Sequence, residues 1–267
     1  MYTKYIVSHW GRREKSENKE RLDGTDSAKS TWKINLGLDV LGKRENGYHD
    51  VRMIMQTVYL YDEVTLEKRQ EPGITVSTNL IYLPTDKTNI AYRAAKILLD
   101  EFGERRGVAI HLKKHIPVAA GMAGGSADAA AVLFGMNRMF GWKLSEKELM
   151  ERGVTLGADV PYCIMRGTAL AEGIGEKLTR LPAMPKCHLL IAKPPISVST
   201  KLVYEKLDAL AIVDHPDIDG IIEGLKDRDL IRVAGSMGNV LQNVTETEYP
   251  VITQIKEEMI KGGASMR

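Results

Sequence analysis

The stretch from residue 116 to residue 133 constrains the fold of this chain more than any other. It passes from an apolar run to a glycine-rich turn and then to an alanine-rich run, reading Ile-Pro-Val-Ala-Ala-Gly-Met-Ala-Gly-Gly-Ser-Ala-Asp-Ala-Ala-Ala-Val-Leu. The preceding residues 108–114 place apolar side chains at alternate positions, which predicts a strand, whereas the alanine-rich run from Ala127 favours a helix. The stretch therefore predicts a strand joined to a helix through a tight turn.

The turn has the composition of an anion-binding site. Gly121, Gly124 and Gly125 let the backbone approach a ligand closely, and Ser126 stands where a helix N-cap is expected. A helix N-terminus carries unpaired N–H groups and the positive end of the helix dipole, so phosphate is a natural occupant. The turn is not a Walker A motif, because no Gly-Lys-Ser/Thr follows, and its spacing differs from the dinucleotide-binding Gly-x-Gly-x-x-Gly motif. The alternative is a connection whose glycines serve only packing.

Hydrophobic periodicity predicts most of the other elements. Strand-like alternation begins at Lys33 and recurs over residues 53–64, and a helix is expected over residues 89–102. Ser145 and Glu148 form a capping box, which predicts a helix that ends near Gly153. A buried strand is expected at 186–193, and further helices at 200–210, 218–226, 230–234, 239–244 and 251–261.

The turn resembles the central motif of the GHMP small-molecule kinases, Pro-x3-Gly-(Leu/Met)-x-Gly-Gly-Ser-(Ser/Ala)-Asp-Ala-Ala. The matching residues are Pro117, Gly121, Met122, Gly124, Gly125, Ser126, Ala127, Asp128, Ala129 and Ala130. Two further matches make residues 30–266 similar to the family of 4-diphosphocytidyl-2-C-methyl-D-erythritol kinases. They are Lys33-Ile-Asn-Leu with Gly47-Tyr48-His49, and Gly157-Ala-Asp-Val-Pro161 with Ala171-Glu-Gly-Ile-Gly-Glu176.

This resemblance implies an α+β, two-domain GHMP kinase fold. The N-terminal, ATP-binding domain, of the ribosomal protein S5 domain 2-like type, is expected at residues 31–165, and an incomplete α/β C-terminal domain at 166–267. The implied activity is ATP-dependent phosphorylation of the 2-hydroxyl of 4-diphosphocytidyl-2-C-methyl-D-erythritol, in the non-mevalonate route to isoprenoid precursors. ATP is expected across the glycine turn with Mg²⁺, and the cytidine substrate in the cleft between the domains.

The resemblance also assigns roles to individual residues. It makes Asp159 the catalytic base and Lys33 the cation that keeps Asp159 ionised and polarises the acceptor hydroxyl. The ATP-binding residues expected are Pro117, Val118, Ala119, Ala120, Gly121, Met122, Ala123, Gly124, Gly125, Ser126, Asn89 and Lys114, with Ser126 also expected on Mg²⁺. The substrate-binding residues expected are Asn35, Tyr48, His49 and Tyr204. His49 is expected to bind the pyrimidine edge and Tyr204 to stack on cytosine, although Tyr204 could instead be a core residue.

Composition limits the class of partner and the location. Residues 11–30 hold eleven charged residues and little to bury, which predicts that residues 1–30 are a disordered or non-native extension. That extension carries seven Lys/Arg and five Asp/Glu, which accounts for the whole net charge of +2. The rest of the chain is neutral, which argues against nucleic acid as a binding partner. We expect no membrane partner, a cytoplasmic location and a monomer or homodimer, because neither a long apolar run nor a signal peptide is found. The two cysteines, Cys163 and Cys187, are expected to be buried thiols.

Two departures from the family pattern keep alternatives open. Thr31-Trp32 stands where the family usually has a small residue before the lysine that corresponds to Lys33. The family's third glycine motif, Gly-Ala-Ser-Met-Ser-Gly-Ser-Gly-Pro, is matched only in part, by Gly263-Ala-Ser-Met-Arg267. If that motif is cut, an incomplete phosphate site, weak ATP binding, very low activity and aggregation are expected. The alternatives are another GHMP small-molecule kinase, of the homoserine or mevalonate type, and a catalytically impaired nucleotide-binding homologue.

Overall fold

The computed structural model describes residues 3–7, 25–115, 117–118, 120–210 and 214–265. The chain divides into two compact units, which are described separately. Residues 12–33 and 57–166 form one unit, called here the loop unit because it contains the glycine turn. Residues 1–11, 34–56 and 167–267 form the other, called the pocket unit. No helix of the described residues is long and apolar enough to cross a membrane.

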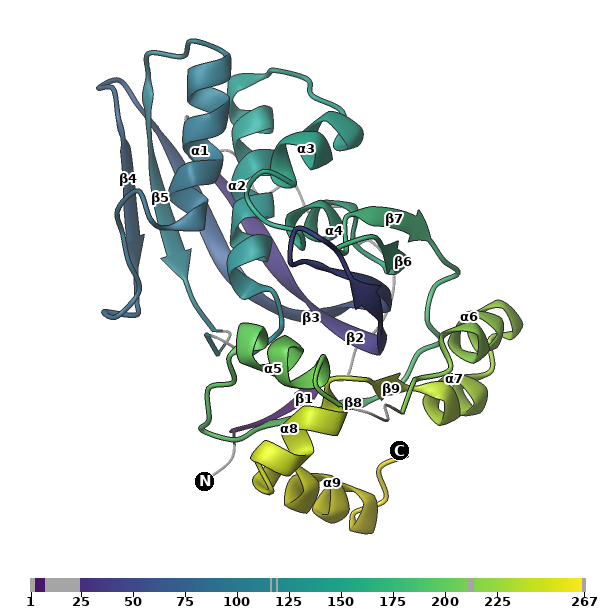
Figure 1. Cartoon of the computed structure of the whole chain (residues 1–267). Helices are drawn as coiled ribbons and strands as arrows, with labels where there is room; N and C mark the ends of the chain where they lie inside the picture. The colour runs from purple at the N-terminus through teal and green to yellow at the C-terminus, as the bar shows by residue number, and fades with distance from the viewer. Residues whose placement is uncertain (1–2, 8–24, 116, 119, 211–213, 266–267) are drawn as a thin grey trace. The chain divides into compact units, whose positions relative to one another are not determined.

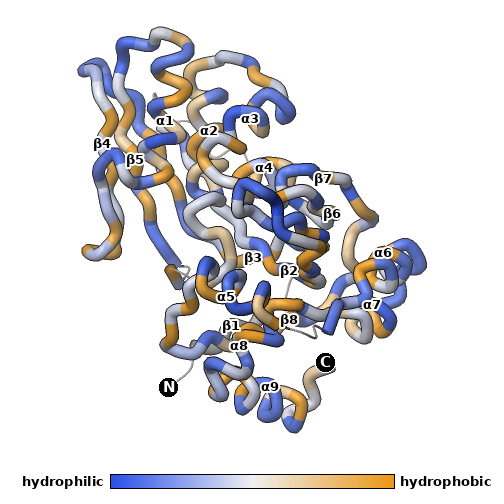
Figure 2. Tube along the Cα trace, viewed as in Figure 1, coloured by the Kyte–Doolittle hydropathy of each residue, from blue (hydrophilic) through white to orange (hydrophobic). Residues whose placement is uncertain are grey.

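Strands β2 (Thr25–Lys43) and β3 (His49–Arg69) contribute residues to both units. In the loop unit, β4 (Ile74–Thr78) runs parallel to β5 (Gly107–Lys113), and β5 runs antiparallel to β3 with Glu63 opposite Lys113. Helices α1 (Ile90–Glu101) and α2 (Gly124–Phe140) cover one face of these strands (Figure 1). Figure 2 shows apolar and polar residues following one another along the strands, which is the pattern of a sheet with one covered face.

Small side chains let the two long helices of the loop unit pack closely. The buried face of α1 is made of alanine and leucine, and four of the nine buried residues of α2 are alanine. Helix α3 (Glu146–Gly153) begins with the predicted capping box, in which Ser145 and Glu148 each bond the other's backbone N–H. Helix α4 (Val160–Met165) follows Asp159 and is buried throughout. The predicted helices at 89–102 and from Ser145 to Gly153 are therefore confirmed.

The start of β2 differs from the sequence-based expectation. The expected extension ended at residue 30, whereas β2 already begins at Thr25. Charged side chains in this part find partners in the loop unit: Asp26 pairs with Arg138, and Lys29 lies over the ring of Tyr61. Ser30 is fully buried, as is the unusual Trp32. The rest of the expected extension, residues 1–2 and 8–24, lies outside the described residues.

In the pocket unit, the N-terminal half of β3 pairs antiparallel with β6 (Thr168–Glu172), with Met53 opposite Ala171. β7 (Lys177–Arg180) pairs with β6, and β9 (Gly238–Asn239) runs parallel to β2. β1 (Thr3–Val7), which falls within the expected extension, is antiparallel to β8 (Leu189–Lys193). The helices of the unit are α5 (Thr200–Leu207), α6 (Ile218–Asp227), α7 (Leu230–Ser236), α8 (Gln242–Glu248) and α9 (Val251–Lys261).

The helix expected at 239–244 is displaced. Gly238 and Asn239 pair with β2 instead, and the backbone N–H of Val240 donates to the carbonyl of Leu38 at 2.8 Å. The Asn239 side chain accepts from the N–H of Leu241, which turns the chain into α8 at Gln242. Strand pairing thus uses the residues in which periodicity alone had predicted the helix start.

Candidate active site

The glycine turn leads into α2 without a side-chain cap. Gly121 has φ 71°, and Ala123, at the N-cap, has φ 56°, in the left-handed region that a residue with a Cβ seldom adopts. The N-cap prediction for Ser126 was wrong: Gly124 and Gly125 join the helix, so Ser126 lies in its first turn, half-buried. The cap shifts because Ala123, not Ser126, makes the left-handed bend.

The first turn of α2 has the electrostatics of an anion site. It contains no acidic residue, and no described side chain caps it, so its leading N–H groups keep the positive end of the helix dipole uncompensated. The turn before it is attached to β2, because the backbone N–H of Lys33 donates to the carbonyl of Met122 at 3.4 Å. Of the residues predicted to bind ATP in this stretch, Ala119 lies outside the described residues, and the others lie along the turn and the first turn of α2.

The predicted catalytic pair lies together in the loop unit. The ammonium group of Lys33, on β2, is 3.4 Å from a carboxylate oxygen of Asp159. The lysine side chain is only 6% exposed, whereas that of Asp159 is 35% exposed. Asp159 ends a short turn after Gly157, where an added Cβ would lie 4.0 Å from the Ser126 hydroxyl oxygen. The pair therefore belongs to the same part of the unit as the start of α2.

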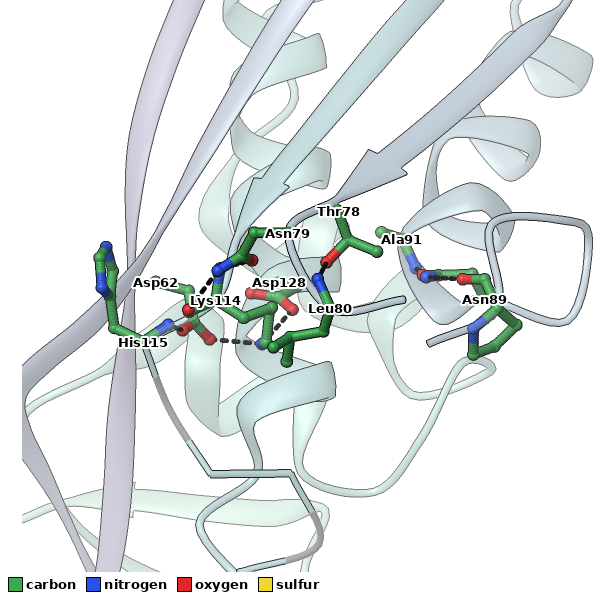
Figure 3. Close-up of polar contacts among 10 residues, drawn as sticks. Asp62, Thr78, Asn79, Leu80, Asn89, Ala91, Lys114, His115 and Asp128 are labelled. Atoms are coloured by element: carbon green, nitrogen blue, oxygen red, sulfur yellow. Dashed lines mark hydrogen bonds and ion pairs between the residues drawn. The ribbon is translucent and has the colours of Figure 1, made fainter. Parts of the chain in front are cut away.

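A buried ion cluster, not foreseen from the sequence, lies just before the turn (Figure 3). The ammonium group of Lys114 contacts the carboxylates of Asp62 and Asp128, the latter at 2.6 Å, and all three side chains are at most 4% exposed. Burial raises the pKa of Asp128 to about 6 against the opposing effect of Lys114. Burial acts to lower the pKa of Lys114, but the two carboxylates together outweigh it and raise that pKa. A single ammonium group thus forms ion pairs with two buried carboxylates.

The same cluster fixes the backbone that enters the turn. The amide side chain of Asn79 bonds both the N–H and the carbonyl of Lys114, at 2.7 and 3.0 Å. Asp62 accepts from the backbone N–H of His115 at 2.6 Å. Figure 3 shows these contacts converging at the end of β5. Lys114, predicted to bind ATP, is thus held by carboxylates of its own unit, and its contact with a nucleotide stays a prediction.

Asn89, the other predicted adenosine-side residue, is used as a helix cap. Its side-chain oxygen accepts from the N–H of Ala91 at 2.8 Å, and its amide group donates to the carbonyl of Pro84 at 2.7 Å. This is the geometry of an N-cap, which satisfies one of the free N–H groups of α1. The structure therefore gives Asn89 a local role, and its proposed contact with ATP is a separate prediction.

The pocket unit holds a pocket of about 510 Å³, which includes three of the four predicted substrate residues. They are Tyr48, His49 and Tyr204; Asn35 is half-buried on β2 and is not part of the lining. The rings of His49 and Tyr204 lie 4.6 Å apart and are tilted by 33°. Tyr48 is 59% exposed, and the other lining residues are Lys43, Gly47, Val51, Met53, Ile174, Thr200, Lys201, Glu205 and Asp208.

Asp208 and Lys43 are pocket residues that the sequence did not reveal. One carboxylate oxygen of Asp208 lies 2.7 Å from Nε2 of His49, and the other accepts from the ammonium group of Lys43 at 2.8 Å. The hydrogen bonds from Lys43 and His49 lower the pKa of Asp208. The only signal available was the spacing of Tyr204 and Asp208, which places both side chains on one face of α5.

No group of three or more His, Cys, Asp or Glu side chains in the described part of the chain is arranged to hold a metal ion. Cys163 is buried, which raises the pKa of its thiol, and Cys187 is half-buried; both are free thiols. Ser126 offers a hydroxyl oxygen in the first turn of α2.

A strand, a left-handed glycine turn, an uncapped helix start and an adjacent Lys–Asp pair together define a GHMP kinase. The family model described as "GHMP kinases N terminal domain" matches residues 89–167, which contain the turn and Asp159. The chain is 60% identical over 236 residues to 4-diphosphocytidyl-2-C-methyl-D-erythritol kinase of Lachnospira eligens, covering 88% of this chain and 82% of that protein. It is 55% identical over 238 residues to the enzyme of the same name from Lachnoclostridium phytofermentans, covering 89% and 82%. The chain belongs to the family of 4-diphosphocytidyl-2-C-methyl-D-erythritol kinases.

Solved structures agree with this assignment. A crystal structure of 4-(cytidine 5'-diphospho)-2C-methyl-D-erythritol kinase matches with a TM-score of 0.72 and 28% identity, over 89% of this chain and 84% of that one. Homoserine kinase from Cytophaga hutchinsonii matches with a TM-score of 0.67 over 92% and 82%, but at 18% identity this likeness shows the fold alone. The predicted family and the predicted GHMP kinase fold are confirmed.

Proposed function

We propose that this chain transfers the γ-phosphoryl group of ATP to the 2-hydroxyl of 4-diphosphocytidyl-2-C-methyl-D-erythritol. The observation that carries the proposal is the Lys33–Asp159 pair beside the start of α2, in a chain of this family. Phosphoryl transfer to an alcohol needs a group that accepts the hydroxyl proton and positive charge near the transferred phosphate. The pair and the helix start supply both.

Asp159 is the proposed base, and its partial exposure leaves the carboxylate open to an incoming hydroxyl. Lys33 is the proposed cation; its ammonium group lies 3.4 Å from a carboxylate oxygen of Asp159, where it can polarise the acceptor hydroxyl. Because Lys33 is almost fully buried, its charge is poorly screened by water and acts strongly over this distance. General base catalysis of this kind contributes about 10²- to 10⁴-fold to a rate.

The phosphates of ATP are proposed to bind the backbone N–H groups of Gly124, Gly125 and Ser126. Mg²⁺ commonly takes one or two protein oxygens and completes its shell with water and phosphate, so the Ser126 hydroxyl in this first turn fits such an ion. Mg²⁺ bound there would neutralise part of the phosphate charge. We also propose that Asn89 and Lys114 line the adenosine side, as the resemblance implies, and that residues 31–165 and 166–267 act as the ATP-binding and C-terminal domains.

The proposed site for the cytidine end of the substrate is the pocket of the pocket unit. Tyr204 offers a ring for stacking, His49 a ring nitrogen for hydrogen bonding, and Tyr48 an exposed ring at the margin. A pocket of about 510 Å³ falls within the size range of small-molecule sites, roughly 300–1,000 Å³. Asn35 is proposed as a further substrate contact on β2.

A substrate panel tests the proposal. ADP production is measured with 4-diphosphocytidyl-2-C-methyl-D-erythritol, homoserine and mevalonate as acceptors, and the product is located by ³¹P NMR. We expect turnover with the cytidine compound alone and phosphate on its 2-hydroxyl. Turnover with homoserine or mevalonate instead would reject the substrate, and ATP binding with no turnover on any acceptor would favour the catalytically impaired homologue.

A further inference from the structure

The contact between Asp208 and His49 determines which nitrogen of the His49 ring carries hydrogen. A carboxylate in its ionised form has only acceptors, and the hydrogen bonds from Lys43 and His49 lower the pKa of Asp208, which favours that form. Nε2 of His49, 2.7 Å from the carboxylate, must therefore be the donor. In a neutral imidazole the other nitrogen is then an acceptor. Nδ1 makes no hydrogen bond to any residue in the described part of the chain.

The surroundings of Asp208 favour a role in recognition over a role in stability. Asp208 is the C-cap of α5, where the helix dipole disfavours a negative charge. Its side chain is nevertheless held on both oxygens, by Lys43 and by His49. Tyr204, one turn earlier on α5, packs against the same His49 ring. One helix face thus fixes both the plane of the imidazole and its pattern of donor and acceptor.

This pattern distinguishes the two common pyrimidines. Cytosine presents an amino donor at the position where uracil presents a carbonyl acceptor. A bare Nδ1 accepts from the amino group, whereas it faces the lone pairs of the uracil carbonyl. We propose that Asp208, held by Lys43, is a specificity-determining residue that makes the pocket select cytidine over uridine by fixing the tautomer of His49. The inference rests on the proposed function, which places the cytidine end of the substrate in this pocket.

The Asp208→Asn variant gives a sharp test because Lys43 orients the new amide. An ammonium group has donors only, so it pairs with the amide oxygen and turns the amide NH₂ group toward Nε2 of His49. Nε2 must then accept, and the hydrogen moves to Nδ1. Adding Lys43→Met to Asp208→Asn removes this bias and lets the amide oxygen face the ring again. Asp219→Asn, an exposed aspartate of the same unit that is not part of the pocket lining, is the matched control.

The tautomer is measured on the full chain without any ligand. Long-range ¹H–¹⁵N spectra of the ¹⁵N-histidine-labelled protein at pH 8 identify the protonated nitrogen of each of the six histidines, and the signals lost in His49→Gln assign His49. We expect hydrogen on Nε2 in the unsubstituted chain and in Asp219→Asn, on Nδ1 in Asp208→Asn, and on Nε2 again in the double variant. Hydrogen on Nδ1, or on both nitrogens, in the unsubstituted chain overturns the proposal.

Selectivity is measured by titrating CDP and UDP into the same proteins, with the ATP site saturated by a non-hydrolysable ATP analogue. We expect CDP to bind about ten- to a hundredfold more tightly than UDP, the usual effect of a matched against a mismatched buried hydrogen bond. Asp208→Asn should lose this preference by tenfold or more, and the double variant should regain part of it. A tautomer that changes while the CDP-to-UDP ratio stays constant overturns the specificity role. If selectivity follows the tautomer but no phosphoryl transfer occurs, the inference stands and the proposed function fails.

Discussion

Replacing Asp128 by asparagine is expected to stabilise the folded chain at neutral and alkaline pH. Asp62 and Asp128 place two carboxylates against the single ammonium group of Lys114, so the buried cluster carries one excess negative charge when all three ionise. Asparagine keeps an oxygen for Lys114 and removes that charge. The buried hydroxyl of Ser30, which lies beside Asp128 and acts to lower its pKa, can hydrogen-bond the amide as well as the carboxylate.

The magnitude follows from the pKa of Asp128, which burial raises from the ordinary 3.8 to about 6. Because the pKa of the folded state is the higher one, the folded chain binds this proton more tightly than the unfolded chain does. The contribution to stability is therefore fully present below pH 4 and is lost as the pH rises through about 6. The difference in pKa corresponds to about 3 kcal/mol. The Asp128→Asn variant should gain about this much in unfolding free energy at pH 8 and almost nothing near pH 4.

Urea unfolding from pH 4 to pH 8 measures this difference. The matched control is Asp100→Asn on α1, because the Asp100 side chain is 62% exposed and pairs with the exposed Lys96. The control should follow the unsubstituted chain within about 0.5 kcal/mol at every pH. An Asp128→Asn variant that is less stable than the unsubstituted chain at pH 8 would show that the charged cluster contributes net stability. An advantage that is the same at every pH would show that the titration of Asp128 is not its cause.

Three further predictions concern the two proposed sites and the backbone that enters the glycine turn. Asp159→Asn should retain ATP binding and lower kcat by about 10²- to 10⁴-fold, and Lys33→Ala should resemble it, with a double variant far from additive because the pair acts as a unit; unchanged turnover would remove Asp159 from the mechanism. His49→Ala should weaken CDP binding by about 1–3 kcal/mol and leave ATP affinity unchanged, as titration calorimetry can show; equal losses for both nucleotides would make His49 structural. Asn79→Ala should lower the unfolding free energy by about 1–3 kcal/mol, because it leaves the N–H and carbonyl of Lys114 without side-chain partners, and a loss below 0.5 kcal/mol in urea unfolding would show that water replaces them.

The sequence predicted best the features that depend on neighbouring residues. The glycine turn and the capping box at Ser145 each involve residues within a few positions of one another. The Lys33–Asp159 pair was also found, although 126 positions separate the two residues, because the family resemblance linked them. The prediction of an N-cap at Ser126 was wrong because the backbone conformation at Ala123, and not the type of side chain, determines where the helix begins.

Contacts between distant residues had no local signal. Asp62 and Lys114 are 52 positions apart, and His49 and Asp208 are 159 apart, so neither pairing could be inferred from spacing. The expected boundary between an ATP-binding domain at residues 31–165 and a C-terminal domain at 166–267 stays a prediction. The compact units instead group residues 34–56 with the C-terminal part, because β2 and β3, with 19 and 21 residues, are long enough to serve both units.

A single-turnover experiment tests whether the Lys33–Asp159 pair transfers phosphate from ATP to the cytidine compound. Excess chain is mixed with γ-labelled ATP and 4-diphosphocytidyl-2-C-methyl-D-erythritol, the reaction is quenched at intervals, and the label is followed into the cytidine compound. We expect one rapid transfer per active site in the unsubstituted chain and a transfer slowed by about 10²-fold or more in Asp159→Asn, with ATP still bound. Transfer at equal rates in both proteins, or label that appears only as inorganic phosphate, would contradict it.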